Sequence, residues 1–450
     1  MTSGDALRAN ALSIFEAANE TPNKLFLITA ERAITYAQMA RAVSERIALL
    51  PTSKLVALVG HASVETIIQL LALLETKTPF VAVHPRWTDT ESSRVLDEAK
   101  PSHLINGDAI KPLFLGETEL LPSALLAVLY TSGTSGRSKG ALLSRDAFMH
   151  AAKASEARLG WRQDDRWLLA MPLAHVGGLS IVLRCLIARK IIVLARIGPF
   201  DAHAFLETVN THRVTIASLV PTQLAHLARA SLASPAHLRA VLLGGAACPE
   251  SVLRRAHALG WKLFTTYGLT EACSQVTTSI SPISSYEEGC GPPLQGVEVE
   301  IREGRVLVRS QAMMLGWLAK DLPKPFDEKG FYDTGDLGSL DEAGRLHLHA
   351  RRTDLIVTGG ENVYPREVEE AVLTLGVREA CVVGIEDELW GQRVALLYVG
   401  EPQTLDALQQ ALAPKLAAFK IPRVVQRVEA LPLNSVGKID RNQARLLLRS

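Results

Sequence analysis

The feature that most constrains the fold is a regular alternation of apolar runs with helical patterns, which begins at Leu55. The alternating segments are 55–59, 64–74, 80–83, 90–99 and 103–106. This strand–helix–strand order predicts parallel strands covered by helices. A second set lies between Trp167 and Phe264, with strands expected at 190–194, 214–219, 240–243 and 262–265. The chain therefore predicts an α/β fold whose large domain holds two parallel-sheet layers.

The pattern changes after the second set. Apolar residues alternate at every second position on both sides of Glu303-Gly304, which predicts a hairpin and hence a small β unit. A second change precedes a helix that is expected to open at Pro365. We expect a large N-terminal domain over 1–350, a hinge at 351–354 and a small, mobile α+β C-terminal domain over 355–450.

The stretch from Tyr130 to Gly140 combines small hydroxyls, three glycines and two cations directly after an apolar run at 124–129. Glycines let the backbone approach an anion closely, and the carboxyl end of a strand is where open α/β sheets bind ligands. A phosphate-binding loop is therefore favoured over a flexible Gly/Ser linker. The spacing does not complete the Gly-x-x-x-x-Gly-Lys-Ser/Thr pattern, which disfavours a kinase or GTPase of that class.

Composition restricts the partners. Lys plus Arg (48) nearly balances Asp plus Glu (47) over 450 residues, so no charge excess favours nucleic acid or an anionic membrane. The five cysteines form no Cys-x-x-Cys pair, which disfavours disulfides and zinc and fits a reducing compartment. The N-terminus lacks a signal-peptide pattern, and charged residues interrupt the most apolar region, 179–197. We expect a cytoplasmic protein with small-molecule partners.

Further motifs accompany the loop at 173–175, 244–247, 267–271, 332–336, 351, 359–362 and 432–438. In this order and spacing they resemble the acyl-adenylate-forming superfamily of acyl-CoA ligases, luciferases and nonribosomal-peptide adenylation domains, over nearly the whole chain. The resemblance implies two half-reactions. A carboxylate attacks the α-phosphate of Mg-ATP to give acyl-AMP and pyrophosphate, and a thiol then displaces AMP. ATP, Mg²⁺ and coenzyme A are the implied cofactors.

The resemblance also implies residue roles. The nucleotide-binding residues would be Thr131, Ser132, Gly133, Thr134, Lys139, Gly245, Ala246, Tyr267, Gly268, Asp336 and Arg351. The catalytic residues would be Lys438, His175, Thr270 and Glu271, with Glu271 also binding Mg²⁺. Lys438 would reach the α-phosphate and the acyl carboxylate, and His175 would sit at the acyl carboxylate and gate the thiol channel. Taken alone, each of these residues has an ordinary structural explanation, so the roles rest on the combination.

One position departs from the superfamily's pattern. The residue two after the matched arginine is commonly acidic or Lys, and it serves as the pivot about which the C-terminal domain turns between half-reactions. In this chain that residue is Thr353, and Asp354 follows. Either Thr353 is the pivot or the pivot has moved by one residue.

Two segments, 218–224 and 240–249, are most similar to the o-succinylbenzoate-CoA ligases of menaquinone synthesis, which implies an aryl acid. The expected pocket is small and mostly apolar and suits a flat ring. Its residues are His175, Arg184, Leu219, Val220, Thr222, Gly244, Gly245, Thr266, Gly268 and Cys273. Arg184 and His226 are the candidates to face a second carboxylate.

Three alternatives stay open from the sequence. The acid is an anthranilate- or benzoate-like one, or the acceptor is the phosphopantetheine arm of a carrier protein, or the chain is a nucleotide-binding sensor without catalysis. The joint presence of Glu271, Asp336 and Lys438 argues against the sensor. The sequence does not decide whether the chain forms a homo-oligomer.

Overall fold

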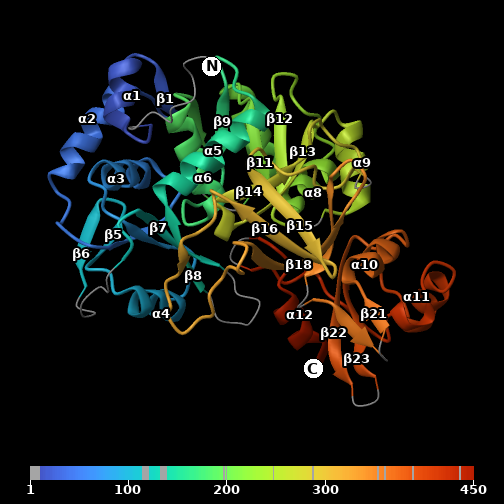
Figure 1. The fold of residues 1–450 in the computed structure, drawn as a ribbon. Helices are drawn as coiled ribbons and strands as arrows, with labels where there is room; N and C mark the ends of the chain where they lie inside the picture. Colours follow the sequence, from blue (N-terminus) through green and yellow to red (C-terminus); the bar gives the residue numbers. More distant parts are fainter. Residues whose placement is uncertain are drawn as a thin grey trace.

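The computed structural model describes residues 11–113, 121–131, 139–195, 198, 200–246, 248–285, 288–351, 354–358, 361–387, 390–434 and 437–449. Figure 1 shows a large body built from the blue-to-yellow part of the chain, with the orange-to-red C-terminal part against one side of it. The expected α/β class is confirmed, with two layered sheets, a small β unit and a smaller α+β unit. None of the described helices has the length and apolar character needed to cross a membrane.

The first sheet contains the strands predicted from 55–106. Its order is β17-β8-β7-β4-β3-β5-β6. The bounds are β3 (Val56–Val59), β4 (Phe80–Val83), β5 (His103–Asn106), β6 (Ala109–Pro112), β7 (Leu125–Thr131), β8 (Lys139–Ser144) and β17 (Gly316–Trp317). Helices α3 (Val64–Glu75) and α4 (Asp89–Ala99) are the crossovers between parallel strands β3, β4 and β5.

The second sheet has the order β14-β13-β12-β11-β9-β10-β1-β2. The bounds are β1 (Leu25–Ile28), β2 (Ala33–Thr35), β9 (Arg166–Leu169), β10 (Ile191–Leu194), β11 (Ile216–Leu219), β12 (Ala240–Gly244), β13 (Leu263–Leu269) and β14 (Ser274–Thr278). The accompanying helices are α1 (Ile14–Glu20), α2 (Tyr36–Ile47), α5 (Arg145–Leu159), α6 (Val176–Ile187), α7 (Ala202–Thr211), α8 (Pro221–Arg229) and α9 (Glu250–Ala258).

The expected parallel strands form the centre of each sheet, and antiparallel strands that the sequence did not predict lie at the edges. Strands β6, β8 and β17 of the first sheet, and β2 and β14 of the second, run antiparallel to their neighbours. The connections into β2, β6, β8 and β14 are too short for a crossover helix, so the chain turns straight back there, whereas β17 reaches β8 from the small β unit. One apolar cluster, with Leu58 and Leu129 from the first sheet, Trp167 from the second and Leu179 from α6, joins the two layers into a single core.

The small β unit consists of β15 (Val297–Arg302), β16 (Arg305–Ser310), β18 (Tyr332–Leu340) and β19 (Leu346–Arg351). Glu303 and Gly304 both have positive φ, 51° and 75°, at the turn between β15 and β16. Such a turn matches the right-handed twist of paired strands, and the predicted hairpin is confirmed.

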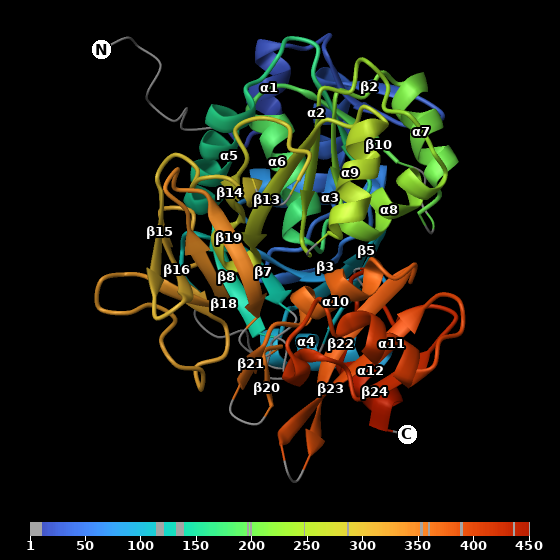
Figure 2. The ribbon, with the colours of Figure 1, turned by 90° about the vertical axis from the view of Figure 1, so that its right-hand side faces the viewer.

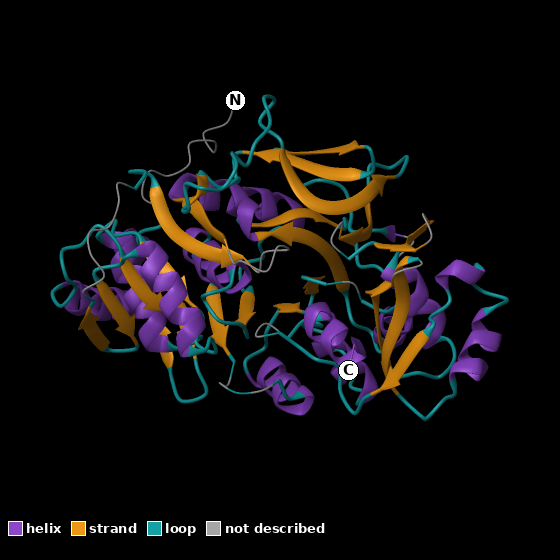
Figure 3. Cartoon of the chain, turned by 90° about the horizontal axis from the view of Figure 1, so that it is seen from below, coloured by secondary structure: helices purple, strands orange, loops and turns teal. Residues whose placement is uncertain are grey.

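The C-terminal unit has its own five-stranded sheet and apolar core. Its strands are β20 (Ile356–Thr358), β21 (Glu361–Val363), β22 (Glu379–Asp387), β23 (Gly391–Val399) and β24 (Val424–Arg427). Its helices are α10 (Pro365–Leu373), α11 (Leu405–Leu412) and α12 (Arg441–Arg449). Figure 2 shows this unit below the large body, and Figure 3 shows both parts from below, coloured by helix and strand.

Candidate active site

The two layers touch at Gly60, the residue directly after β3. The Gly60 N–H donates to the Val83 carbonyl (2.9 Å), and the Gly60 carbonyl accepts from the Leu173 N–H (2.9 Å). A Cβ on Gly60 would lie 2.3 Å from the Ala174 nitrogen, closer than such atoms approach in proteins. Glycine at this position therefore lets the segment before α6 lie on the end of the first sheet, and so places His175 beside the residues that follow β4.

The ring of His175 packs at a tilt of 51° against that of His84, a residue that the sequence did not single out. The rings of His84 and His175 have centroids 4.8 Å apart. Burial lowers the pKa of His84 to about 4 and that of His175 to about 3. Within the described residues, the Nε2 atoms of both rings are buried without a hydrogen-bond partner. The one sequence signal for His84 is its place immediately after a buried parallel strand, where ligands bind.

Lys438 reaches this region from the C-terminal unit. A Cβ on Gly245 would lie 3.2 Å from Lys438 Cε and 3.5 Å from Nζ, so the lysine side chain passes directly over that glycine. The Thr222 hydroxyl donates to the Gly437 carbonyl (3.3 Å) and anchors the turn that bears the lysine. The Lys438 charge also contributes to the lowered pKa of His175. The structure thus brings together four predicted site residues, Lys438, His175, Gly245 and Thr222, from two units.

The glycines of the predicted pocket are required by close packing. A Cβ on Gly244 would lie 2.7 Å from Thr266 Cγ2, and one on Gly268 would lie 1.7 Å from the Ser274 carbonyl oxygen. Cys273 is fully buried at the start of β14, with its backbone in the left-handed region (φ 50°). The remaining predicted lining residues, Leu219, Val220 and Thr222, follow one another from the end of β11 into α8. The expected pocket residues on β11, β12 and β13 therefore lie at the carboxyl ends of these strands, whereas Arg184 lies in the last turn of α6.

The expected ribose and adenine residues meet in a short contact. The Tyr267 hydroxyl donates to Asp336 Oδ2 at 2.5 Å, and both side chains are buried. Asp336 pairs with Arg351 in the β18–β19 ladder, which places the two predicted residues on adjacent strands. Ala246, next to Gly245, is exposed.

Glu271 and Lys139 are linked through two aromatic rings. The Tyr332 hydroxyl donates to Glu271 Oε1 (3.1 Å), the Trp317 ring lies 6.4 Å from that of Tyr332, and Lys139 Nζ lies 5.4 Å from the Trp317 centroid. Thr131 pairs with Lys139 across β7 and β8. The predicted loop residues Ser132, Gly133 and Thr134 lie outside the described residues, as does Thr353.

This arrangement fits a magnesium ion brought by a nucleotide. Among the described residues, no three His, Cys, Asp or Glu side chains gather to hold a metal. Mg²⁺ commonly takes only one or two carboxylates together with substrate phosphates and water. Glu271, at the short helical turn Thr270–Ala272, is suited to be such a carboxylate.

Arg184 lies deeper, on α6, and is only 4% exposed. Its Nε and Nη2 atoms are buried and have no hydrogen-bond partner in the described part of the chain, and its guanidinium lies 5.7 Å from the Trp167 centroid. Burial lowers its pKa to about 10, so it stays charged at neutral pH. A small pocket borders it, lined by Ala152, Ser155, Glu156, Leu159, Gly160, Trp161, Trp167, Arg184 and Ile216. Arg184 is the one predicted pocket residue among them.

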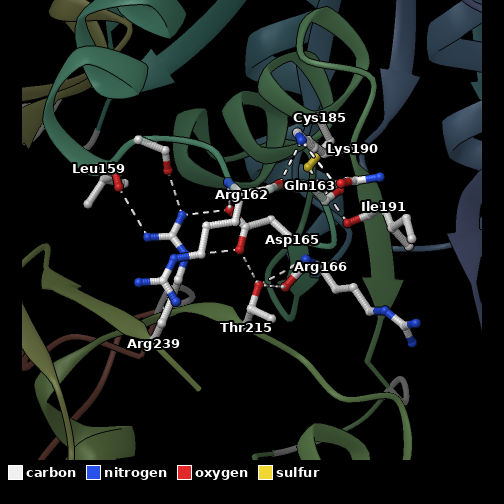
Figure 4. A network of polar contacts seen from close by, with 11 residues as sticks. Leu159, Arg162, Gln163, Asp165, Arg166, Cys185, Lys190, Ile191, Thr215 and Arg239 are labelled. Carbon is white, nitrogen blue, oxygen red and sulfur yellow. Dashed lines mark hydrogen bonds and ion pairs between the residues drawn. The ribbon is translucent and has the colours of Figure 1, made fainter. Parts of the chain in front are cut away.

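A fully bonded network holds one wall of this pocket (Figure 4). Arg239 donates to both carboxylate oxygens of Asp165 (2.8 and 2.6 Å) and to the carbonyls of Leu159 (3.1 Å) and Gly160 (2.5 Å). The Thr215 hydroxyl donates to the same carboxylate (2.8 Å). The network therefore fixes the turn after α5 next to Arg184. His226, the other candidate for a second carboxylate, lies edge-on to the ring of Phe200, 6.2 Å away.

A two-layer α/β body, a C-terminal unit that carries Lys438 and a Tyr267–Asp336 contact are features that the resemblance implied for an adenylate-forming enzyme. Residues 111–318 match the family of AMP-binding enzymes, and residues 367–438 match the AMP-binding enzyme C-terminal domain. The chain belongs to this family, and its type is the AMP-forming acyl-CoA synthetase of the adenylate-forming superfamily.

Relatives with assigned activities agree. The 2-succinylbenzoate–CoA ligase of Bacillus pumilus is 32% identical over 94% of this chain and 95% of its own length. The o-succinylbenzoate CoA synthetase of Bacillus subtilis, solved with the acyl-adenylate intermediate OSB-AMP, superimposes with a TM-score of 0.86 at 29% identity, covering 96% of this chain and 97% of that one. The same enzyme with ATP and a magnesium ion gives 0.84 at 28% identity, covering 97% and 99%.

Proposed function

We propose that this enzyme activates 2-succinylbenzoate with ATP and Mg²⁺ and transfers the acyl group to coenzyme A. The ligases of this acid are among its relatives along nearly the whole chain. The observation that carries the choice of acid is Arg184, a buried guanidinium with two nitrogens that no described protein group satisfies. A buried cation in this state favours an anionic partner, and 2-succinylbenzoate carries a second carboxylate.

The nucleotide would be held by residues on β13 and β18 and by residues that follow β12 and β13. Asp336 would accept hydrogen bonds from the ribose hydroxyls, and the hydroxyl of Tyr267 would keep that carboxylate in place. Gly245 and Ala246 would provide the flat wall against the adenine. Glu271 would hold Mg²⁺, which neutralises phosphate charge when bound, and Thr270 and Lys139 would contact the phosphates.

The acid would lie between Lys438 and Arg184. Lys438 would place its ammonium group between the attacking carboxylate and the α-phosphate, so that like charges can approach. Neutral His175 would line the path of the thiol, and the second carboxylate would pair with Arg184. Cys273 and Leu219 are both buried and would face the ring. No side-chain nucleophile is needed, because AMP is the leaving group.

The acid assignment is tested by changing Arg184 and varying the acid. Arg184→Met should lower kcat/KM for 2-succinylbenzoate by about 10²-fold, since one member of a buried charge pair is lost. For benzoate, which lacks the second carboxylate, the same substitution should change the pyrophosphate-release rate little. His226→Ala tests the other candidate for the second carboxylate and should affect neither acid if Arg184 makes this contact. A wild-type enzyme that prefers an anthranilate- or benzoate-like acid would contradict the proposal.

Coenzyme A is the proposed acceptor, with the phosphopantetheine arm of a carrier protein as the alternative. The proposal follows the names of the relatives. Offering acyl-AMP with coenzyme A and with a holo carrier protein, whose phosphopantetheine thiol is free, separates the two. Five free thiols in the described chain are consistent with a cytoplasmic, reducing location, which we also propose. Whether the enzyme works as a homo-oligomer is decided by light scattering.

We retain 1–350 and 355–450 as the proposed domains, with the hinge at 351–354. The Asp354 carboxylate lies 3.6 Å from Arg441 Nε and 3.7 Å from Arg445 Nη2, both on α12. This contact ties Asp354 to the C-terminal unit, and it favours Thr353 over Asp354 as the pivot. Thr353→Pro should then slow thioester formation more than adenylation, because proline fixes its own φ and restricts the residue before it.

A further inference from the structure

His84 combines deep burial with an unsatisfied polar atom. Its side chain is 3% exposed, and its Nδ1 accepts a hydrogen bond from the Arg86 N–H (3.1 Å). A neutral imidazole carries one N–H, so the ring proton is on Nε2. Since burial lowers the pKa of His84 to about 4, the ring is neutral at pH 7 and Nε2 is a hydrogen-bond donor.

That donor has no acceptor within the described chain. His84 Nε2 is buried without a partner, although its ring is closely surrounded by the rings of His175 (4.8 Å) and Trp87 (6.0 Å). Buried N–H groups are almost always bonded in native proteins, and an unbonded one indicates a missing ligand or water. The tilted ring contact with His175 places His84 beside the residue that is expected to lie at the acyl carboxylate.

We propose that His84 is a further acyl-binding residue, whose Nε2–H donates a hydrogen bond to the carboxyl-derived oxygen of the acid and of the acyl-adenylate. The inference rests on the proposed function of the same site. Lys438 also lies near His175, but it belongs to the C-terminal unit and is expected to leave between the half-reactions. His84 belongs to the first sheet and would hold the acyl oxygen through both, so that the carbonyl stays polarised when the thiol attacks.

The test compares two ligands that differ in the acyl group. The sulfamoyl analogue of 2-succinylbenzoyl-AMP carries the acyl oxygen, and AMP lacks it. In calorimetry, His84→Phe keeps the aromatic packing but removes the donor, and should weaken the analogue about tenfold without changing AMP affinity. His84→Asn, which retains an N–H donor, should recover part of the loss. His61→Phe is the matched control at the same sheet edge, because the Nε2 of His61 already contacts Asn106 Oδ1 (3.2 Å).

A kinetic measurement separates His84 from Lys438. His84→Phe should slow thioester formation from supplied acyl-AMP about tenfold as well as adenylation, whereas loss of Lys438 should spare the second step. If His84→Phe weakens AMP and the analogue equally, or weakens neither, His84 has a structural or water-bound role and the proposal is overturned. If the wild-type enzyme binds the analogue no better than AMP, the result contradicts both the proposed acid and the role of His84.

Discussion

Two groups of polar side chains in this enzyme differ in how their hydrogen bonds are satisfied. The buried Asp165 and the partly buried Arg239 and Thr215 bond to one another and to the carbonyls at the end of α5. Arg184 and His84 are buried, but each keeps nitrogen atoms without a partner in the described chain. The first group consolidates the fold, and we propose that a ligand completes the second.

The pKa values of the two groups show the same contrast. Burial alone would raise the pKa of Asp165, but hydrogen bonds from Arg239, the Arg162 N–H and Thr215 outweigh it and hold the pKa below its ordinary value. For Arg184 and His84, burial dominates and lowers the pKa of each. A buried group that is bonded keeps its charge at little cost, whereas an unbonded one is destabilised. The substitutions below test whether the bonded group mainly affects the free energy of unfolding and the unbonded group mainly affects ligand binding and catalysis.

The largest effect is expected for the bonded group. Arg239→Met should lower the free energy of unfolding by about 3–5 kcal/mol, because it leaves the buried Asp165 carboxylate unpaired. Urea denaturation measures the loss. Arg254→Met, which breaks an exposed i,i+4 pair with Glu250, should change stability by less than about 0.5 kcal/mol. A similar loss of unfolding free energy in Arg239→Met and Arg254→Met would contradict the stabilising role of the Asp165–Arg239 network.

Lys438 should show the opposite pattern, with a large effect on chemistry and little on the fold. Lys438→Ala is expected to slow acyl-AMP formation at least about 10²-fold, as with removal of one preorganised charge-stabilising donor. Thioester formation from supplied acyl-AMP should be nearly unchanged. Single-turnover pyrophosphate release and thioester assays measure the two steps, and equal losses in both would contradict the assigned role.

Asp336 tests the nucleotide side of the site. Asp336→Ala should weaken ATP binding by about 1.5–3 kcal/mol, because a charge-assisted contact to the ribose is removed. Calorimetry with ATP measures the change. Tyr267→Phe deletes the 2.5 Å hydroxyl contact but keeps the Asp336 carboxylate, so it should weaken ATP binding less than Asp336→Ala does. An ATP affinity that is unchanged in Asp336→Ala would refute the ribose assignment.

Arg184 provides the sharpest stability comparison with Arg239, because the residue type is the same. Arg184→Met removes an unpaired buried charge, which stabilises the fold, and also a contact with Trp167 worth about 0.5–2 kcal/mol. These effects oppose each other, so the free energy of unfolding should change by less than about 1 kcal/mol. A loss as large as that of Arg239→Met would mean that Arg184 is a structural residue.

Much of this architecture was predictable from local sequence. The period of apolar residues located β3, β4 and β5 to within one residue, since buried parallel strands read as continuous apolar runs. Glu303-Gly304 identified its hairpin because few residues tolerate positive φ. The antiparallel edge strands were missed, because strand direction depends on how far the connecting segment reaches and not on the strand's own composition.

The contiguous motifs at 267–271 and 332–336 could be read from the sequence, and the roles assigned to their residues stay predictions. Contacts that long-range packing creates carry little sequence signal. His84 has no motif, and its significance appears only when the Gly60 crossing brings His175 against it. The pairing of Asp165 with Arg239 joins residues 74 positions apart in the sequence. Neither residue carries a local signal that distinguishes it from a solvated charge.

The smallest effect is expected at the contact between the two units, where a polar pair is neither buried nor unsatisfied. Arg229 on α8 donates to Glu379 Oε1 (2.9 Å) and to the Arg378 carbonyl (3.2 Å), and both side chains are substantially exposed. The pair joins the units in the orientation that presents Lys438, so it should favour adenylation. Exposed ion pairs contribute about 0.2–1 kcal/mol, which corresponds to at most about a fivefold shift between orientations.

Arg229→Ala should therefore slow adenylation by about two- to fivefold at low salt and leave thioester formation unchanged or slightly faster. Because the Debye length shortens as ionic strength rises, the difference in adenylation rate between Arg229→Ala and the wild type should disappear near 1 M salt. The charge exchange Arg229→Glu with Glu379→Arg should restore part of the rate, whereas Arg254→Ala, at an ion pair within α9, should not separate the two steps. Equal slowing of both half-reactions would show that the contact supports general stability. Selective slowing of the first would show that a weak exposed pair affects catalysis because it acts on the balance between two orientations of similar free energy.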